Sequence, residues 1–286
     1  MSVPIAGFSI AGLGNLPAHA GLSYQYLLVR LLLGTASVER AGSIIKQRLD
    51  YSALPASPQV SRASIAVRTF LVDYAIGGSV KRLIKVTIPD NRIFYKELLN
   101  EFAHFIYQQN KGCFTTAFVF LYRIFERISF SVPLLYTSTQ KDYIGTFNAL
   151  KGILNADTSG EMALFKKFLS QGKFIDPLKL NVNLSLSFKS SFGHQDKYYV
   201  LTTKKVTCLT SPDPINRTAD IKFSDVPELL KAIRNRFFHS RTGDGKDNIF
   251  IEEMPDSDEY FECINQTIAN FLSIVTLQTI AAKYQL

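Results

Sequence analysis

Apolar residues recur every three or four positions in several parts of this chain, the interval that aligns side chains on one face of an α-helix. Two such runs follow a turn-rich segment at 88–91 and are separated by a polar segment at 108–112, and the second run ends near Pro133. We expect them to form an antiparallel pair of helices. Their stripes are Phe94, Leu98, Phe102 and Phe105, and then Phe114, Phe118, Leu121, Phe125 and Ile128.

Helical spacing returns toward the C-terminus. One helix is expected to begin near Val226 and to stop at Gly243. In the final helix the apolar residues alternate in threes and fours, as they do at the seam of a helix bundle. Four long helices therefore frame the body of the protein. The stripes of the last two are Val226, Leu229, Leu230, Ile233 and Phe237, and then Phe261, Ile264, Ile268, Phe271 and Val275.

The region between the second and third long helices has a different pattern. Two short helices are expected over 140–175. Residues 181–188, 197–209 and 220–223 then alternate apolar with polar positions, are rich in β-branched residues and are separated by turn residues. These features predict a small antiparallel sheet. We therefore expect a β-rich insertion at about 176–223.

Residues 1–88 precede the helical body as a basic N-terminal segment or subdomain. Within them, 22–33 have a helical pattern, whereas 64–74 fit either a strand or a helix. Residues 1–85 contain nine Lys and Arg against three Asp and Glu, in a chain of formal net charge +8. Such a segment suits a polyanion such as RNA, or an anionic membrane surface, although the same charges can also serve only for solvation.

The predicted protein is thus mainly α, with a helical domain over 89–286 that carries the β-rich insertion. An apolar content of 47% with 20% charged residues is typical of a globular chain. Three widely spaced cysteines argue against a disulfide framework, and no signal peptide is recognised, which favours a cytoplasmic setting. The uncharged segment 263–282 contains several Asn and Gln, so we expect a buried bundle helix there rather than a membrane span.

Candidate chemistry lies in Arg234-Asn-Arg-Phe-Phe-His239, at the end of the third long helix. At 100° per residue, Asn235 and His239 share a face directed away from the apolar stripe, and Arg234 lies on its flank. An Asn and a His four residues apart can meet one phosphate or ribose, and an arginine adds a planar fork of donors. The adjacent Phe238 indicates that something other than water covers this face.

This arrangement resembles the HEPN family (higher eukaryotes and prokaryotes nucleotide-binding domain), whose motif is Arg-x4–6-His. The resemblance covers roughly 91–135 and 224–284 and leaves the N-terminal segment and the β-rich insertion outside. It implies a four-helix domain that dimerises, so that two motifs face each other across a shared cleft. Many members of the family are metal-independent ribonucleases, often in toxin–antitoxin or antiviral defence systems, and others are inactive scaffolds.

The residue types suit cleavage of RNA by its own 2′-hydroxyl. Histidine titrates near neutral pH, so His239 is the candidate general acid and base. Arg234 would stabilise negative charge on the phosphorane oxygens, and Asn235 would orient the ribose or phosphate. The expected products end in a 2′,3′-cyclic phosphate.

Three further residues are weaker candidates. Arg236 and Arg241 could contact RNA, although Arg241 could instead satisfy the helix end. Glu126, on the second helix, could orient Arg234 or pair with an arginine of its own helix. The histidines and cysteines have no metal-ligand spacing, so we expect neither a metal nor another cofactor.

The sequence therefore favours an endoribonuclease that acts on RNA as a homodimer, as a toxin or antiviral defence component. An antitoxin or another regulatory protein is a further expected partner, and a membrane is not. The alternative is a catalytically inactive HEPN-like module, in which Arg234 and His239 hold the dimer or bind a nucleotide. A third possibility is a coincidental motif in an ordinary helical structural protein.

Overall fold

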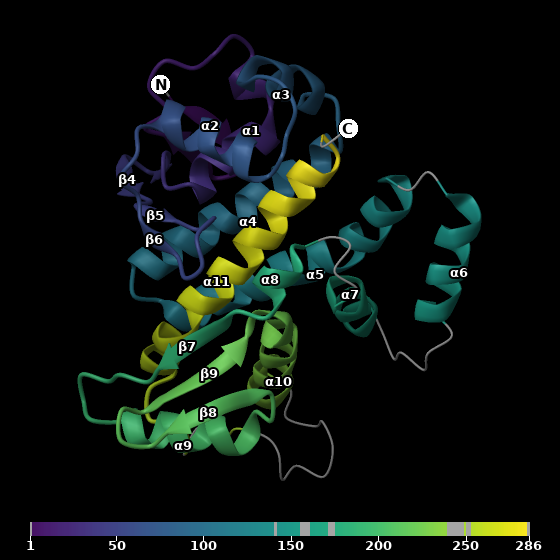
Figure 1. Ribbon diagram of the computed structural model, residues 1–286. Coiled ribbons are helices and arrows are strands. Elements are labelled where there is room, and N and C mark those ends of the chain that lie inside the picture. Colours follow the sequence, from purple (N-terminus) through teal and green to yellow (C-terminus); the bar gives the residue numbers. More distant parts are fainter. Residues whose placement is uncertain are drawn as a thin grey trace.

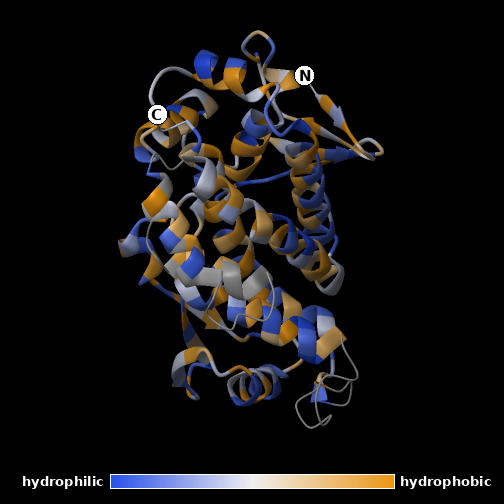
Figure 2. Cartoon of the chain, turned by 90° about the vertical axis from the view of Figure 1, so that its right-hand side faces the viewer, coloured by the Kyte–Doolittle hydropathy of each residue, from blue (hydrophilic) through white to orange (hydrophobic). Residues whose placement is uncertain are grey.

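A computed structural model of the protein describes residues 2–139, 142–154, 161–170, 175–238, 249 and 253–284. Most of this part of the chain is helical, and its strands form small antiparallel sheets (Figure 1). The N-terminal residues lie at one end of the molecule and the sheet of residues 183–222 at the other (Figure 1). Figure 2 shows apolar and polar residues interleaved around the helices, as expected when each helix turns one face to a shared core.

The last helix, α11 (Ser257–Ala282), is the centre of the core. Its side chains are buried along almost the whole of its second half. They are covered because α5 (Phe114–Thr139), α1 (Tyr24–Leu32) and β7 (Asn183–Ser187) all pack against it. The uncharged segment 263–282 is therefore a buried bundle helix, as expected. Within the described residues, no helix has both the length and the apolarity needed to span a membrane.

The first two long helices expected from the sequence are α4 (Arg92–Asn110) and α5, which pack against each other. The expected end of α5 near Pro133 is wrong, because the helix continues to Thr139. Pro133 lies inside this helix and is buried, although a proline lacks the N–H of the i→i−4 hydrogen bond and its ring crowds the preceding turn. The two short helices expected next are α6 (Tyr143–Leu154), which projects from the body (Figure 1), and α7 (Glu161–Ser170), which packs on α5.

The third long helix is α10 (Val226–Phe238), and its predicted stripe is confirmed. Val226, Leu229, Leu230 and Ile233 are fully buried, and Phe237 packs against the same core. The expected helix end at Gly243 lies outside the described residues. Whereas α5 packs extensively on both α4 and α11, α10 packs less extensively on α11, and the rings at its C-terminal end contact α5 and α11.

The insertion at 176–223 is only partly as expected. Strands β7, β8 (Leu209–Asp213) and β9 (Thr218–Lys222) form an antiparallel sheet in the order β7–β9–β8. The strand expected over 197–209 is wrong, since most of that segment lies in helix α9 (Gln195–Lys205). Its β-branched residues favour a strand, but Tyr198, Leu201 and Thr202 recur at helical spacing and are buried on one face of the helix, so tertiary packing overrides local propensity. The short helix α8 (Pro177–Leu180) precedes the sheet.

The N-terminal segment shares the hydrophobic core of the helical body. Helix α1 packs on α4 and α11, and the ambiguous segment 64–74 lies, apart from Tyr74, in helix α2 (Ala63–Asp73). Arg30 is buried and donates to the backbone carbonyls of Leu13 and Thr35, so this cation is not offered to a partner. The remaining elements are β1 (Val3–Ile5), β2 (Phe8–Ala11), β3 (Ser37–Arg40), β4 (Ser43–Lys46), β5 (Leu49–Asp50), β6 (Ser57–Pro58), α2 (Ala63–Asp73) and α3 (Val80–Thr87).

Buried asparagines of α11 tie distant segments together. The Asn270 side-chain amide donates to the carbonyls of Tyr51 at 3.0 Å and Ala53 at 2.9 Å. The amide of Asn265 donates to the Phe114 carbonyl at 2.9 Å. These polar residues, which made a membrane span unattractive, thus satisfy backbone groups that the core would otherwise leave without partners.

We expect Asn270→Ala to lower the free energy of unfolding by about 2 kcal/mol, because two carbonyls at the junction of α11 with the N-terminal segment lose their donor. Urea unfolding followed by circular dichroism measures the change. Asn148→Ala, at an exposed position of α6, is the matched control and should stay within about 0.5 kcal/mol of the wild type. Equal stabilities of the two variants would contradict the assignment.

Candidate functional site

The two phenylalanines of the Arg234–His239 segment anchor the end of α10. Phe238 stacks parallel to Phe118 of α5, with ring centroids 5.9 Å apart. Phe237 meets Phe261 of α11 edge to face, with centroids 5.1 Å apart. Phe238 remains 42% exposed. The sequence predicted that something other than water covers this face, and Phe118 of α5 provides part of that cover. Because these contacts hold the last described turn of α10 against two helices, the polar residues just before it are held in place as well.

Arg234 lies on the flank of α10 that faces α5. Its guanidinium carbon is 5.1 Å from the centroid of the Tyr122 ring, within the range of a cation–π contact. Its Nη1 donates to Oδ1 of Asn235 at 3.0 Å. Burial raises the pKa of the Tyr122 hydroxyl; Arg234 opposes this shift, and Glu126 adds to it. Tyr122 is therefore a neutral platform for the arginine, and sequence reasoning did not identify it.

Glu126 is exposed, one turn along α5 from that platform. Among the described residues, Glu126 forms no ion pair with Arg234. The pairing with an arginine of its own helix, the expected alternative, is not formed either. Arg123 and Arg127 instead bind Glu101 of α4, at 2.7 and 3.3 Å.

Asn235 and Arg236 line a surface cavity of about 520 Å³ on the outer side of α10. The other charged side chains around it come from three helices: Lys166 of α7, Lys205 of α9, and Glu228 and Lys231 of α10. Cations thus outnumber carboxylates in the lining. A concave site with several convergent cations suits a ligand that carries phosphate groups.

The charges in this cavity differ in how far they are neutralised. Lys166 binds Asp225 at 3.2 Å and Glu228 at 3.4 Å. Burial acts to lower the pKa of Lys166, but these carboxylates outweigh it and raise the pKa. Lys231 has no ion-pairing carboxylate among the described residues. Burial raises the pKa of the Cys208 thiol, which also lines the cavity, to about 11, so this cysteine is not a nucleophile at neutral pH.

The structure thus brings together only part of the predicted site. A hydrogen bond joins Arg234 to Asn235, and Asn235 shares the cavity with Arg236. Arg234 itself lies beside the cavity, on the Tyr122 ring, rather than in its lining. His239 and Arg241 lie outside the described residues.

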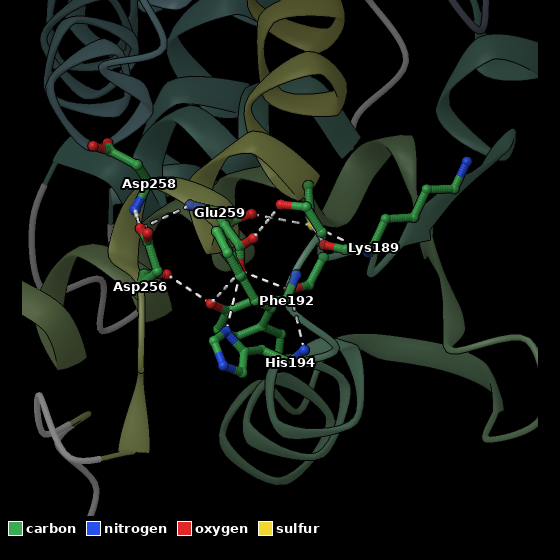
Figure 3. A network of polar contacts seen from close by, with 10 residues as sticks. Lys189, Phe192, His194, Asp256, Asp258 and Glu259 are labelled. Carbon is green, nitrogen blue, oxygen red and sulfur yellow. Dashed lines mark hydrogen bonds and ion pairs between the residues drawn. The ribbon is translucent and has the colours of Figure 1, made fainter.

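A second polar cluster, unforeseen from the sequence, surrounds Glu259 at the start of α11 (Figure 3). The carboxylate accepts hydrogen bonds from Ser190 at 2.6 Å, Ser191 at 2.8 Å and Tyr198 at 3.1 Å. Nδ1 of His194 lies 3.2 Å from the same carboxylate. The Ser190 hydrogen bond, followed by those of the other donors, lowers the pKa of Glu259 to about 2 although burial opposes the shift.

This cluster fastens the loop before α9 to the N-terminus of α11. The Ser190 hydroxyl also accepts from the backbone N–H groups of Phe192 and His194, and the Asp256 side chain caps α11. A serine hydroxyl that donates to a carboxylate is not activated as a nucleophile, and a carboxylate of such low pKa is a poor base. The cluster is therefore structural. Asp256 and Glu259 have the spacing of a capping box, which is the signal that could have located it.

The described residues contain no group of His, Cys, Asp and Glu side chains able to hold a metal ion. Comparison of the chain with models of protein families, with curated proteins and with solved structures found no match. The functional interpretation therefore depends on the geometry of α10 and its neighbours.

Glu259→Gln should destabilise the protein at neutral pH, and the difference from the wild type should shrink in acid. The folded state lowers the pKa of Glu259 from 4.5 to about 2, so it favours the ionised carboxylate. The resulting stabilisation is complete above pH 4.5 and is lost as the pH falls toward 2. Urea unfolding between pH 7 and pH 3 measures this trend. Glu262→Gln, exposed one turn further along α11, is the control, and a pH-independent deficit in Glu259→Gln would contradict the mechanism.

Proposed function

We propose that this protein is a metal-independent endoribonuclease of HEPN type that binds RNA on the outer side of α10. The observation that carries the proposal is the cavity in which Asn235 and Arg236 of the motif lie together with three lysines. Such a cavity supports phosphate binding directly beside the residues expected to perform the chemistry.

In the proposed reaction the 2′-hydroxyl of the RNA attacks the adjacent phosphorus. Arg234, positioned by Tyr122 and joined to Asn235, stabilises the negative charge that develops on the phosphorus oxygens. His239 directly follows the last described residue of α10. It removes the proton from the 2′-hydroxyl and returns a proton to the departing 5′-oxygen, which leaves a 2′,3′-cyclic phosphate.

The surrounding cations would bind the phosphates that flank the cleaved bond. Lys231 and Lys205, which line the cavity, are candidates for this role, and Arg236 and Arg241 are further candidates. The same proposal includes a four-helix HEPN-type unit formed by α4, α5, α10 and α11. A homodimer would join two motifs across one cleft. The proposal also includes a cytoplasmic role as a toxin or antiviral defence component, with an antitoxin or another regulatory protein as partner.

The second candidate is a nucleotide-binding module without catalytic activity. The size of the cavity, about 520 Å³, favours it, because this volume lies within the range of small-molecule and cofactor sites. Calorimetric titration with mononucleotides, together with an absence of RNA cleavage by the wild type, would support this alternative.

The purified wild type is expected to cleave total RNA and tRNA in the presence of EDTA. Arg234→Ala and His239→Ala should each lower the rate at least about a hundredfold, as loss of transition-state stabilisation or of the proton-transfer group does in other enzymes. Gel analysis and detection of 2′,3′-cyclic termini measure the reaction. Arg68→Ala, exposed on α2, is the matched arginine control. Undiminished cleavage by His239→Ala would eliminate the proposed mechanism.

Tyr122→Leu should slow cleavage about tenfold, because a cation–π contact with Arg234 worth about 1–2 kcal/mol is lost. Tyr122→Phe keeps the ring and should retain most of the activity. Initial rates for both variants, with thermal unfolding to verify folding, distinguish a positioning role from a merely structural one. A Phe variant as slow as the Leu variant would show that the ring does not position Arg234.

A further inference from the structure

Cations and aromatic rings alternate on the side of α5 that faces α4, which is the side away from Arg234. The N-terminal sheet packs against α4 in the same region. We call this surface the aromatic–cation stripe. Its members come from β2, β3, α4, the residue that follows α4, and α5; they are Phe8, Arg40, His104, Tyr107, Lys111, Phe120 and Arg123.

Two cations converge on one ring at the first end of the stripe. The guanidinium carbon of Arg40 lies 5.0 Å from the Tyr107 ring centroid and 5.1 Å from that of Phe8. Nζ of Lys111 lies 5.7 Å from the Tyr107 centroid. Both cations are exposed, and neither forms an ion pair with a described carboxylate. A phosphate bound between them would relieve their mutual repulsion.

The other end of the stripe is a stack of rings beside an arginine. His104 stacks on Phe120, with centroids 4.5 Å apart and an interplanar angle of 13°, and meets Phe8 edge to face. Arg123 lies 5.8 Å from the Phe120 centroid, and its side chain is 50% exposed although it also binds Glu101. Nδ1 of His104 is buried without a hydrogen-bond partner among the described residues. His104 and Phe120 are half-buried, and Phe120 lies next to the positive charge of Arg123.

The stripe also leads toward the proposed cleavage site. Arg123 and Tyr122 are consecutive on α5, so their side chains leave the helix about 100° apart. Arg234 rests on Tyr122, and Arg123 stands beside Phe120. A ligand that crosses the exposed face of α5, a distance of about 10 Å, would therefore pass from the stripe to Arg234.

We propose that the aromatic–cation stripe binds single-stranded RNA and guides it across α5 to Arg234; the inference rests on the proposed function. Phosphates bind at Arg40, Lys111 and the exposed side of Arg123, and bases stack on Tyr107 and Phe120. An unpaired strand can place its bases on aromatic rings, whereas a duplex keeps them inside. An anionic membrane would use the cations but not the rings.

The test measures binding separately from cleavage. A fluorescein-labelled 2′-O-methyl oligouridine has no free 2′-hydroxyl and so cannot be cleaved by the proposed route. Its affinity is determined by fluorescence anisotropy at several salt concentrations for the wild type and for Arg40→Ala/Lys111→Ala. Loss of two phosphate contacts should reduce the slope of log affinity against log salt by about 1.4.

Two further variants make the test specific. Arg62→Ala/Lys81→Ala is the control, because it removes one arginine and one lysine from other exposed positions of the N-terminal segment. This variant should leave the slope unchanged. Tyr107→Leu removes a ring but keeps its apolar volume and should weaken binding about fivefold or more. If the alanine pair lowers Tm, Arg40→Gln/Lys111→Gln replaces it.

The outcomes separate the two proposals. An unchanged slope in the stripe variant overturns the stripe even if unmodified RNA is cleaved. Stripe-dependent binding without cleavage of unmodified RNA in EDTA supports the stripe and overturns the ribonuclease. Equal affinity for a duplex of the same length, or binding to phosphatidylserine vesicles in place of the oligonucleotide, also overturns the stripe.

Discussion

The burial of α11 is the constraint on which the rest of the structure depends. A helix with so few charges must be covered on every side, and α5, α1 and β7 provide this cover from three distant parts of the sequence. The N-terminal segment and the insertion are therefore structural parts of one core rather than appendages. One consequence concerns α5: its core side is committed to α11, and α4 and α10 flank what remains exposed, so the aromatic–cation stripe and the Arg234 side chain lie on opposite flanks of this helix.

The distribution of carboxylates is the second organising feature. Glu101 binds two arginines within the α4–α5 pair, and Asp225 and Glu228 share Lys166. Glu259 is held by hydroxyl groups at the start of α11. Because these acids are already paired with other residues, none of them forms a described ion pair with Lys231, Arg40 or Lys111 of the proposed RNA-binding surfaces.

The end of α10 combines anchoring residues with the residues proposed to perform the chemistry. Phe237 and Phe238 fix the helix on α5 and α11, and that contact sets where Arg234 and Asn235 point. Tyr122 then restrains the guanidinium on one flank, while the lysines of the cavity gather on the other. Fixed donors beside a cationic cavity are preorganised for a phosphate, which is the property that catalysis of phosphoryl transfer requires.

The long helices can be predicted from the order of amino acids alone, since each buries one face and burial imposes a period of 3.6 residues that can be read directly. The sequence likewise indicated Arg234 and Asn235 as candidate site residues that lie close together, because neighbours on a helix share or adjoin a face. It failed at α9, where β-branched residues outweighed a short helical period. Only the tertiary structure decided that Tyr122 supports Arg234, that three helices contribute lysines to one cavity, and that Arg40 meets Tyr107. Those contacts join residues far apart along the chain, and their proximity comes from packing around α11, which no local pattern encodes.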